Sequence, residues 1–292
     1  MRKRRLFFLL FPILFFCLTC KSAPPLEETP ASDLSFDHIE AENLSRVVLY
    51  YRLRTGNPRS LPLRLQVGGW KALVDGLEYG KKDAVLTADE ISADEVLVEV
   101  PPGGFAEKTF RLDLNLGAYR DVPAAGDSGG YRAELLLNLV YQYGKGKTLA
   151  GETSAQARFP RIRKPEFTIT GIAILQAELI NTRFRVNLRI DNPNVFPVNL
   201  SSFGYELYGA GRFWAEGRET EALRIPAGGS AETRLFLLMN FINMKRNLLD
   251  EVIAMRKVPY RFSGEALIET GVSWLPEFRM HFDHQGQSEV FK

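Results

Sequence analysis

The chain has 292 residues, 45% of them hydrophobic and 11% aromatic, so hydrophobic cores can supply its stability. Its formal net charge is +2 and becomes −2 once the basic N-terminal residues are removed, which excludes the basic face that nucleic-acid binding needs. Of its two cysteines, Cys17 and Cys20, one remains once residues 1–19 are removed, so no intramolecular disulfide is expected.

The first residues predict an export signal. The basic segment MRKRR precedes an apolar run from Leu6 to Leu18, which is shorter than the roughly 20 residues needed to cross a bilayer. The run ends in CLTCK, which resembles the lipobox of bacterial lipoproteins, where a small residue precedes the acylated cysteine. Because Thr19 is small and Phe16 is bulky, we predict residues 1–19 as the signal peptide and Cys20 as the lipidation site. An uncleaved anchor, or a soluble cytosolic protein, is the alternative.

Residues 20–31 are predicted to be a lipidated tether. The stretch KSAPPLEETPAS (21–32) contains three prolines and no apolar periodicity, which is typical of an extended, semi-rigid spacer. This tether would hold the folded body at the cell envelope, either at the outer membrane or at the periplasmic face of the inner membrane.

Two blocks of sequence occur twice in the same order. GNPRSLPLRL (56–65) matches DNPNVFPVNL (191–200) at a shift of 135, and VPPGGFAEKTFRLDLNL (100–116) matches IPAGGSAETRLFLLMNF (225–241) at a shift of 125. In the first pair Asn57, Pro58 and Pro62 fall on Asn192, Pro193 and Pro197, while Leu61 faces Phe196. We infer a duplication, with copies at 32–161 and 162–292. The ten extra residues of the first copy are placed in the charged, loop-like stretch 80–96.

The hydrophobic pattern predicts β-strands. RFRVNLRI (183–190) alternates strictly between apolar and polar residues, as does a strand with one buried and one solvated face in an antiparallel sheet. VVLYYRLR (47–54) alternates more weakly, and further alternation follows the Gly-Gly turns at 103–104 and 228–229. Short strands separated by Gly and Pro turns indicate sandwiches or barrels.

The proline corner at 191–200 is interpreted as a fold element. Pro193 cannot donate to a sheet ladder and favours an extended Asn192, so strand pairing should stop there. Asn192 can hydrogen-bond within its own turn, Phe196 is free to enter the core, and Pro197 keeps the chain extended. We therefore expect one strand to leave its sheet at this corner and cross to the other.

One segment predicts a helix instead. NMKRNLLDEVIAMRK (243–257) can place its apolar residues on one helical stripe with charged residues outside. We expect a short amphipathic helix covering one end of the second sandwich; a helix that contacts a membrane is the alternative.

The second copy resembles the late-embryogenesis-abundant type 2 domain, also called the WHy (water stress and hypersensitive response) domain. That family shows an Asn-Pro-Asn-x-[Phe or Leu]-Pro corner, a Tyr-x-Leu strand, a small-residue turn and an Ile-Pro-Ala-Gly-Gly hairpin. These occur here at 192–197, 205–207, 209–211 and 225–229. The first copy is diverged, with Arg59 in place of the second Asn of the corner and GGWKALVDG in place of the Tyr-x-Leu strand.

This resemblance implies an all-β fold: two tandem antiparallel sandwiches of the immunoglobulin or fibronectin type III kind, with one short helix in the second. It also implies association with desiccation and stress tolerance, and no enzyme activity.

The residues suggest little chemistry. His281 and Asp283 share a strand face while His284 points away, so they offer at most two metal ligands, and we expect neither a metal nor another cofactor. His38 is interpreted as structural, and GKGKT (144–148) as a hairpin turn because it lacks the first glycine of a phosphate loop.

Four aromatic residues are the better candidates for binding. Trp70, Tyr79, Phe213 and Trp214 are candidates for binding a peptide, a glycan or another chain at the sandwich edges, and the alternative is that they cap the ends of the cores.

The sequence thus predicts a non-enzymatic, membrane-anchored protein that binds or protects envelope components, such as a protein or glycan, under desiccation or osmotic stress. An assembly subunit that presents an edge strand to a protein partner is the alternative. An enzyme using paired carboxylates is the third hypothesis.

Overall fold

The computed structural model describes residues 30–80, 83–119, 130–146, 148–176, 182–239 and 257–291. Cys20, the tether up to residue 29 and the predicted helix up to residue 256 lie outside these ranges. Within them the regular secondary structure is strand apart from two 3-10 helices, η1 (Ala93–Glu95) and η2 (Leu116–Tyr119), which confirms the predicted all-β fold class. No helix in the described part has the length and hydropathy needed to span a membrane.

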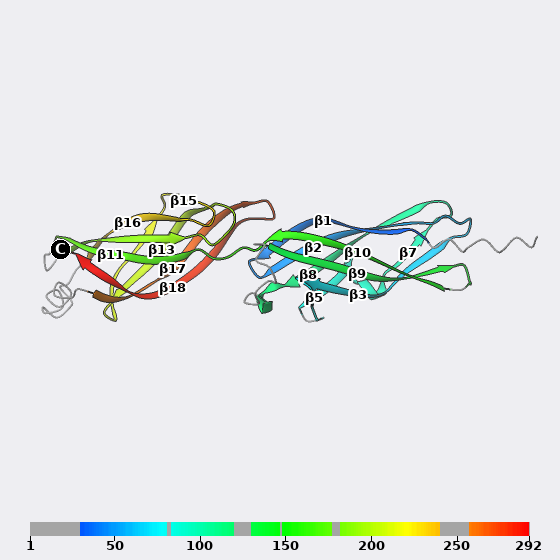
Figure 1. Ribbon diagram of the computed structural model, residues 1–292, viewed down its shortest axis with the longest axis horizontal. Helices are drawn as coiled ribbons and strands as arrows, with labels where there is room; N and C mark the ends of the chain where they lie inside the picture. The colour runs from blue at the N-terminus through cyan, green and yellow to red at the C-terminus, as the bar shows by residue number, and fades with distance from the viewer. Residues whose placement is uncertain are drawn as a thin grey trace, which may run out of the picture.

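The first unit, from β1 to β10, is built of two antiparallel sheets (Figure 1). One has the order β1-β2-β8-β5-β6, with bounds Ser32–Asn43, Arg46–Gly56, Phe105–Asn115, Ala84–Ala88 and Ile91–Ser92. The other has the order β10-β9-β3-β4, with bounds Thr148–Pro160, Gly130–Tyr143, Leu63–Val74 and Leu77–Glu78; β7 (Leu97–Val100) also pairs with β3.

The second unit, from β11 to β18, has the strand order β14-β13-β17-β18-β11-β12-β16. The bounds in that order are Arg212–Glu219, Val198–Gly209, Lys257–Val272, Leu275–Phe291, Glu166–Gln176, Thr182–Asp191 and Ser230–Met239; β15 (Leu223–Ile225) also pairs with β13. A short parallel pairing of β11 with β18, Ile172 opposite Val290 and Ala173 opposite Phe291, joins the two layers along one side.

The two units share one strand order. The layers β1-β2-β8 and β10-β9-β3 of the first correspond to β11-β12-β16 and β18-β17-β13 of the second. The register also corresponds: Leu49 pairs with Leu112 in the first unit, and Phe184 pairs with Leu237 in the second, at the same sequence shifts of 135 and 125. In each unit the proline corner lies where the chain crosses between layers, from β2 to β3 and from β12 to β13. The origin of the two units by duplication stays a prediction.

Each unit encloses its own apolar core. One cluster of buried residues extends from Leu34 to Phe159 and the other from Ile162 to Phe282. On β12 the predicted alternation is confirmed, because Phe184, Val186, Leu188 and Ile190 are completely buried while the residues between them reach the outer face.

The stretch 80–96 is not the loop that its charge predicts. It contains β5, β6 and η1, and β5 pairs antiparallel with β8. Ala84, Leu86 and Ala88 alternate along β5 and are buried, so this five-residue strand adds its inner face to the first core. Because charged residues flank β5 on both sides, its short apolar alternation was not recognised from the sequence.

The two units lie end to end (Figure 1). Trp274 is prominent among the residues through which they touch. Trp274, in the turn between β17 and β18, makes an edge-to-face contact with Phe159 of β10, with ring centroids 6.0 Å apart. Its carbonyl oxygen accepts a hydrogen bond of 3.2 Å from the Ala41 amide of β1. The side chain packs against both cores, so it forms a joint between the units.

Candidate functional site

The asparagine of each proline corner is a buried structural anchor. The Asn192 amide nitrogen donates to the carbonyl oxygens of Phe196 (2.9 Å) and Pro226 (3.0 Å). Asn57 makes the same contacts with Leu61 (2.8 Å) and Pro101 (3.1 Å). Each side chain therefore holds its corner against the Gly-Gly hairpin of the same unit, which assigns both residues to the fold rather than to a binding site.

The other corner residues lie at the surface or partly beneath it. Pro58, Pro62, Pro193 and Pro197 are all exposed. Phe196 is half-buried against the second core, whereas its counterpart Leu61 is 57% exposed. The corners thus provide no pocket.

The third corner residue differs between the units. In the second unit the buried Asn194 exchanges two hydrogen bonds with the backbone of Arg163, which lies in the segment between the units: 2.7 Å from the Arg163 amide and 2.9 Å to its carbonyl. In the first unit Arg59 lies instead over the Tyr143 ring, 4.3 Å from its centroid. Asn194 therefore fixes the connection between the units, a role that its motif did not reveal.

The expected exposure of the aromatic residues is wrong for two of the four. Tyr79 and Trp214 are both 4% exposed and belong to the cores, and Trp70 is half-buried against the first core. Phe213 is 43% exposed and contacts Tyr208 edge-on at 5.6 Å.

The burial of Trp214 follows from its neighbours. The ring stacks on Phe184 at 5.7 Å and covers Gly209, where an added Cβ would lie only 2.1 Å from the ring. Trp214 therefore fills the inner space between β14 and the opposite layer instead of facing a ligand.

A broad furrow crosses the outer face of β14, β13, β17 and β18, with a volume of about 1000 Å³. Its floor is low because the central positions carry small residues, Ser202, Gly204 and Ser263. The charged and polar side chains along it are Glu206, Glu216, Glu265, Asp283, Arg218, Arg279 and His281. This mixture of charges fits a polar ligand such as a glycan or a peptide backbone.

Two of the predicted cluster residues line this furrow. His281 pairs with Glu265 across the strands and Asp283 with Ser263, so both face outward as predicted, while His284 packs its ring against Tyr260 at 6.0 Å. The Arg261 guanidinium donates two hydrogen bonds, of 2.8 and 2.6 Å, to the Asp283 carboxylate. These bonds hold the pKa of that carboxyl below its ordinary value. The described residues contain no group of three or more side chains arranged to hold a metal ion.

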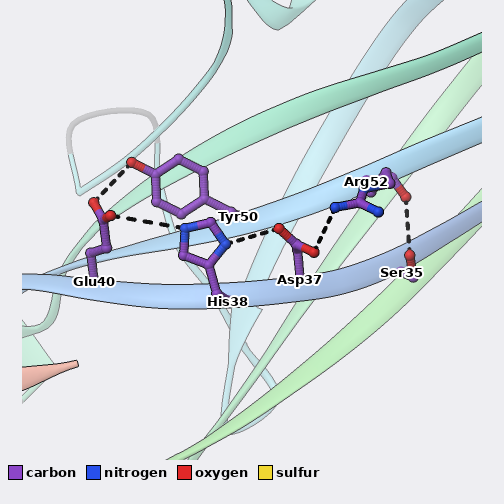
Figure 2. A network of polar contacts seen from close by, with 6 residues as sticks. All are labelled: Ser35, Asp37, His38, Glu40, Tyr50 and Arg52. Atoms are coloured by element: carbon purple, nitrogen blue, oxygen red, sulfur yellow. Dashed lines mark hydrogen bonds and ion pairs between the residues drawn. The ribbon is translucent and has the colours of Figure 1, made fainter. Parts of the chain in front are cut away.

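His38 belongs to a polar network on the outer face of β1 and β2 (Figure 2). Its ring stacks on Tyr50 at 4.2 Å and contacts Asp37 at 2.9 Å, and Asp37 also accepts a hydrogen bond from Arg52. The contact with His38 is the main cause that lowers the pKa of Asp37. A Ser-His-Asp arrangement for catalysis would need the serine hydroxyl to hydrogen-bond to the imidazole. Here the Ser35 hydroxyl donates to the Arg52 carbonyl instead, so the network links the two strands.

The sequence-based analysis missed one exposed apolar feature. On β16, Phe236 is 69% and Leu238 is 60% exposed, whereas the alternating residues Leu235 and Leu237 are buried. The signal was present in LFLLM (235–239), where strict alternation gives way to a continuous apolar run.

The part of the chain from β12 to β18 matches a family model. Residues 187–286 match LEA_2, late embryogenesis abundant protein. This segment is therefore similar to the LEA_2 family. The family is generally non-enzymatic, and the match lies within the second unit, which also carries the furrow and the bare apolar positions of β16.

Solved structures similar to the chain include one protein of the same description. A protein from Arabidopsis thaliana is 16% identical, covers 46% of this chain and 86% of its own, with a TM-score of 0.35. A putative late embryogenesis abundant protein is 12% identical, covering 44% and 73% with a TM-score of 0.31. A protein from Archaeoglobus fulgidus is 13% identical, covering 44% and 96% with a TM-score of 0.26. A search of curated proteins found no match.

Proposed function

We propose that the protein is a non-enzymatic binding protein of the LEA type 2 kind, held at the bacterial cell envelope by an acyl chain on Cys20. The observation that carries the proposal is the LEA_2 match across residues 187–286. The work of such a protein is to bind or protect an envelope component, such as a protein or a glycan, when water is lost or osmolarity rises.

The outer-face furrow supports binding as the mode of action. It is long, open and lined by charges of both signs, which suits a polar chain lying across the sheet. A general acid at neutral pH needs a raised pKa, whereas the pKa of Asp283, a carboxyl that lines the furrow, is shifted downward. Contact with a ligand therefore fits this surface better than proton transfer.

The anchor is tested by fatty-acid labelling in cells. The wild-type chain should incorporate a radioactive fatty acid and remain with the membrane fraction, while the Cys20→Ser chain should lose the label. Label that persists in the mutant would reject the anchor at Cys20.

The binding role is tested in a deletion strain. Loss of the gene should reduce survival after drying or osmotic upshift, and the wild-type chain should restore it. A double variant with Glu206→Ala and Glu216→Ala in the furrow should restore it less well, whereas Glu152→Ala on β10 of the first unit is the matched control. Equal rescue by both variants would remove the furrow from the proposal.

A second candidate function is an assembly subunit that binds a protein partner through a sheet edge. It is favoured by the exposed Phe236 and Leu238 on β16, which lies at the end of its sheet. Stoichiometric recovery of one membrane protein with the chain, in a deletion strain that tolerates drying, would favour this function over protection.

A further inference from the structure

The free edge of β16 differs from the equivalent edge in the first unit. β8 corresponds to β16 and lies between β2 and β5, so both of its edges are paired. In the described part of the second unit, β16 pairs with β12 alone. A strand at the end of a sheet presents unpaired backbone groups that can accept another strand.

The side chains on the two edges differ in the same direction. At the outward positions where β8 carries Arg111 and Asp113, β16 carries Phe236 and Leu238. In the first unit those two charges pair with each other at 2.8 Å beside the covering strand. The edge of β8, which β5 covers, thus carries charged side chains. The unpaired edge of β16 carries two of the most exposed apolar side chains among the described residues.

The outer face beside β16 is also basic. Arg183, Arg185 and Arg234 form no ion pair within the described ranges, whereas Arg189 on the same face is neutralised by Asp191 at 2.7 Å. Arg185 and Arg234 line a hollow of about 480 Å³ on this face, and Glu232 is the one acidic side chain that lines it. A partner here would be acidic as well as apolar.

We propose that the free edge of β16 captures an extended segment of another protein, antiparallel to β16, with β-branched side chains such as Val or Thr opposite Leu238 and Phe236 and an acidic side chain opposite Arg234. This inference deepens the proposed binding role and rests on it. It names β-strand addition as the mode, in which backbone hydrogen bonds supply affinity and alternate side chains supply specificity.

The strand β5, which pairs with the β8 edge in the first unit, shows which side chains suit a segment bound at the equivalent edge of β16. β5 pairs Val85 with Asp113 and Thr87 with Arg111 of β8. Transferred to β16 in the same register, Val85 would face Leu238, Thr87 would face Phe236, and Asp89, two residues further on, would face Arg234. In place, Asp89 already pairs with a basic residue of β8, Lys108. A segment of β5 is therefore a suitable probe for the edge of β16.

The test measures binding of a fluorescent peptide of residues 83–90 (DAVLTADE) to the full chain by anisotropy. We expect weak but saturable binding that falls about tenfold or more, equivalent to about 1.4 kcal/mol, when Phe236→Lys removes the apolar contact. The matched control is Leu97→Lys, because Leu97 is similarly exposed, at 58%, on β7 of the first unit. Circular dichroism and melting of the variants show that the fold is retained.

A charge exchange sharpens the result. The peptide with Asp89→Lys should bind the wild-type chain more weakly, and Arg234→Glu should restore its binding. Absence of saturable binding, or equal binding by the Phe236→Lys and Leu97→Lys chains, would overturn the proposal. A dimer of the chain that Phe236→Lys abolishes would also overturn it, in favour of a second copy. Fatty-acid labelling at Cys20 is independent of all these outcomes, so the anchor and the strand capture can fail separately.

Discussion

The two units share strand order and register but close the open side of the sandwich with different parts. In the first unit the chain leaves β3 after the short β4 and adds β5 to the opposite layer, which buries Leu86 and covers the edge of β8. In the second unit β14 stays beside β13 and fills the inner space with the Trp214 ring. The Trp214 side chain thus fills the space that β5 closes in the first unit. The edge of β16 is left unpaired in the described part. In the same strand framework, the segment that follows β3 or β13 therefore decides whether the edge of β8 or β16 is paired.

The largest expected effect comes from removing these two closing side chains. Trp214→Ala should lower the free energy of unfolding of the second unit by about 3–5 kcal/mol, and Leu86→Ala should lower that of the first by about 2–5 kcal/mol, because each leaves a cavity. Denaturant unfolding of each variant checks this. A loss below 1 kcal/mol for Trp214→Ala would mean that the ring does not close the second core.

The corner asparagines should have the next largest effect, and an equal one in the two units. Asn192→Ala and Asn57→Ala each leave buried carbonyl groups without a donor, which should cost about 1–3 kcal/mol. Chemical denaturation measures both, with the exposed Asn199→Ala as the control. Effects that differ by more than about 2 kcal/mol would show that the two corners are not equivalent.

A buried tyrosine in each unit should make stability depend on pH at high pH. Burial raises the pKa of Tyr205 in the second unit to about 12, and burial also raises the pKa of Tyr51 in the first. A phenol whose folded pKa lies above its unfolded value stabilises the fold below the unfolded pKa, near 10, and loses that contribution as the pH rises towards the folded pKa. Stability should therefore fall from about pH 10 upward in both units.

Phenylalanine at either position removes this titration. Because the Tyr51 hydroxyl is buried without a hydrogen-bond partner among the described residues, Tyr51→Phe should also raise stability at neutral pH by about 1 kcal/mol. Thermal melts at pH 7 and pH 11 check both statements. A destabilised Tyr51→Phe chain at pH 7 would reveal a partner for the hydroxyl.

The smallest expected effect concerns the joint between the units. Trp274→Ala removes the ring contact with Phe159, worth about 0.5–1.5 kcal/mol, without opening either core completely. The two unfolding transitions should separate, and small-angle scattering should show a wider range of relative orientations. Unchanged scattering would assign the joint to Asn194 and Arg163 instead.

The strands and corners were predictable because their signals are local. The alternation of 183–190 and the fixed backbone of Pro193 act within a few residues, and the repeated blocks placed the crossings in both halves. β5 was not predicted because its five residues include two alanines, so its alternation between apolar and polar positions is weak beside the charged residues that flank it. The burial of Tyr79 and Trp214, and the contact of Trp274 with Phe159, depend on segments far apart in the sequence. No local pattern encodes them.

The parallel pairing of β18 with β11 also sets an order of folding. β11 is the first strand of the second unit to emerge during synthesis, but the contact that joins it to the other layer waits for Val290 and Phe291. The first unit is complete once β10 has appeared, about 130 residues earlier. The strand edges of the second unit are therefore still exposed after the first unit has closed, which makes the second unit the half more open to non-native strand pairing during folding.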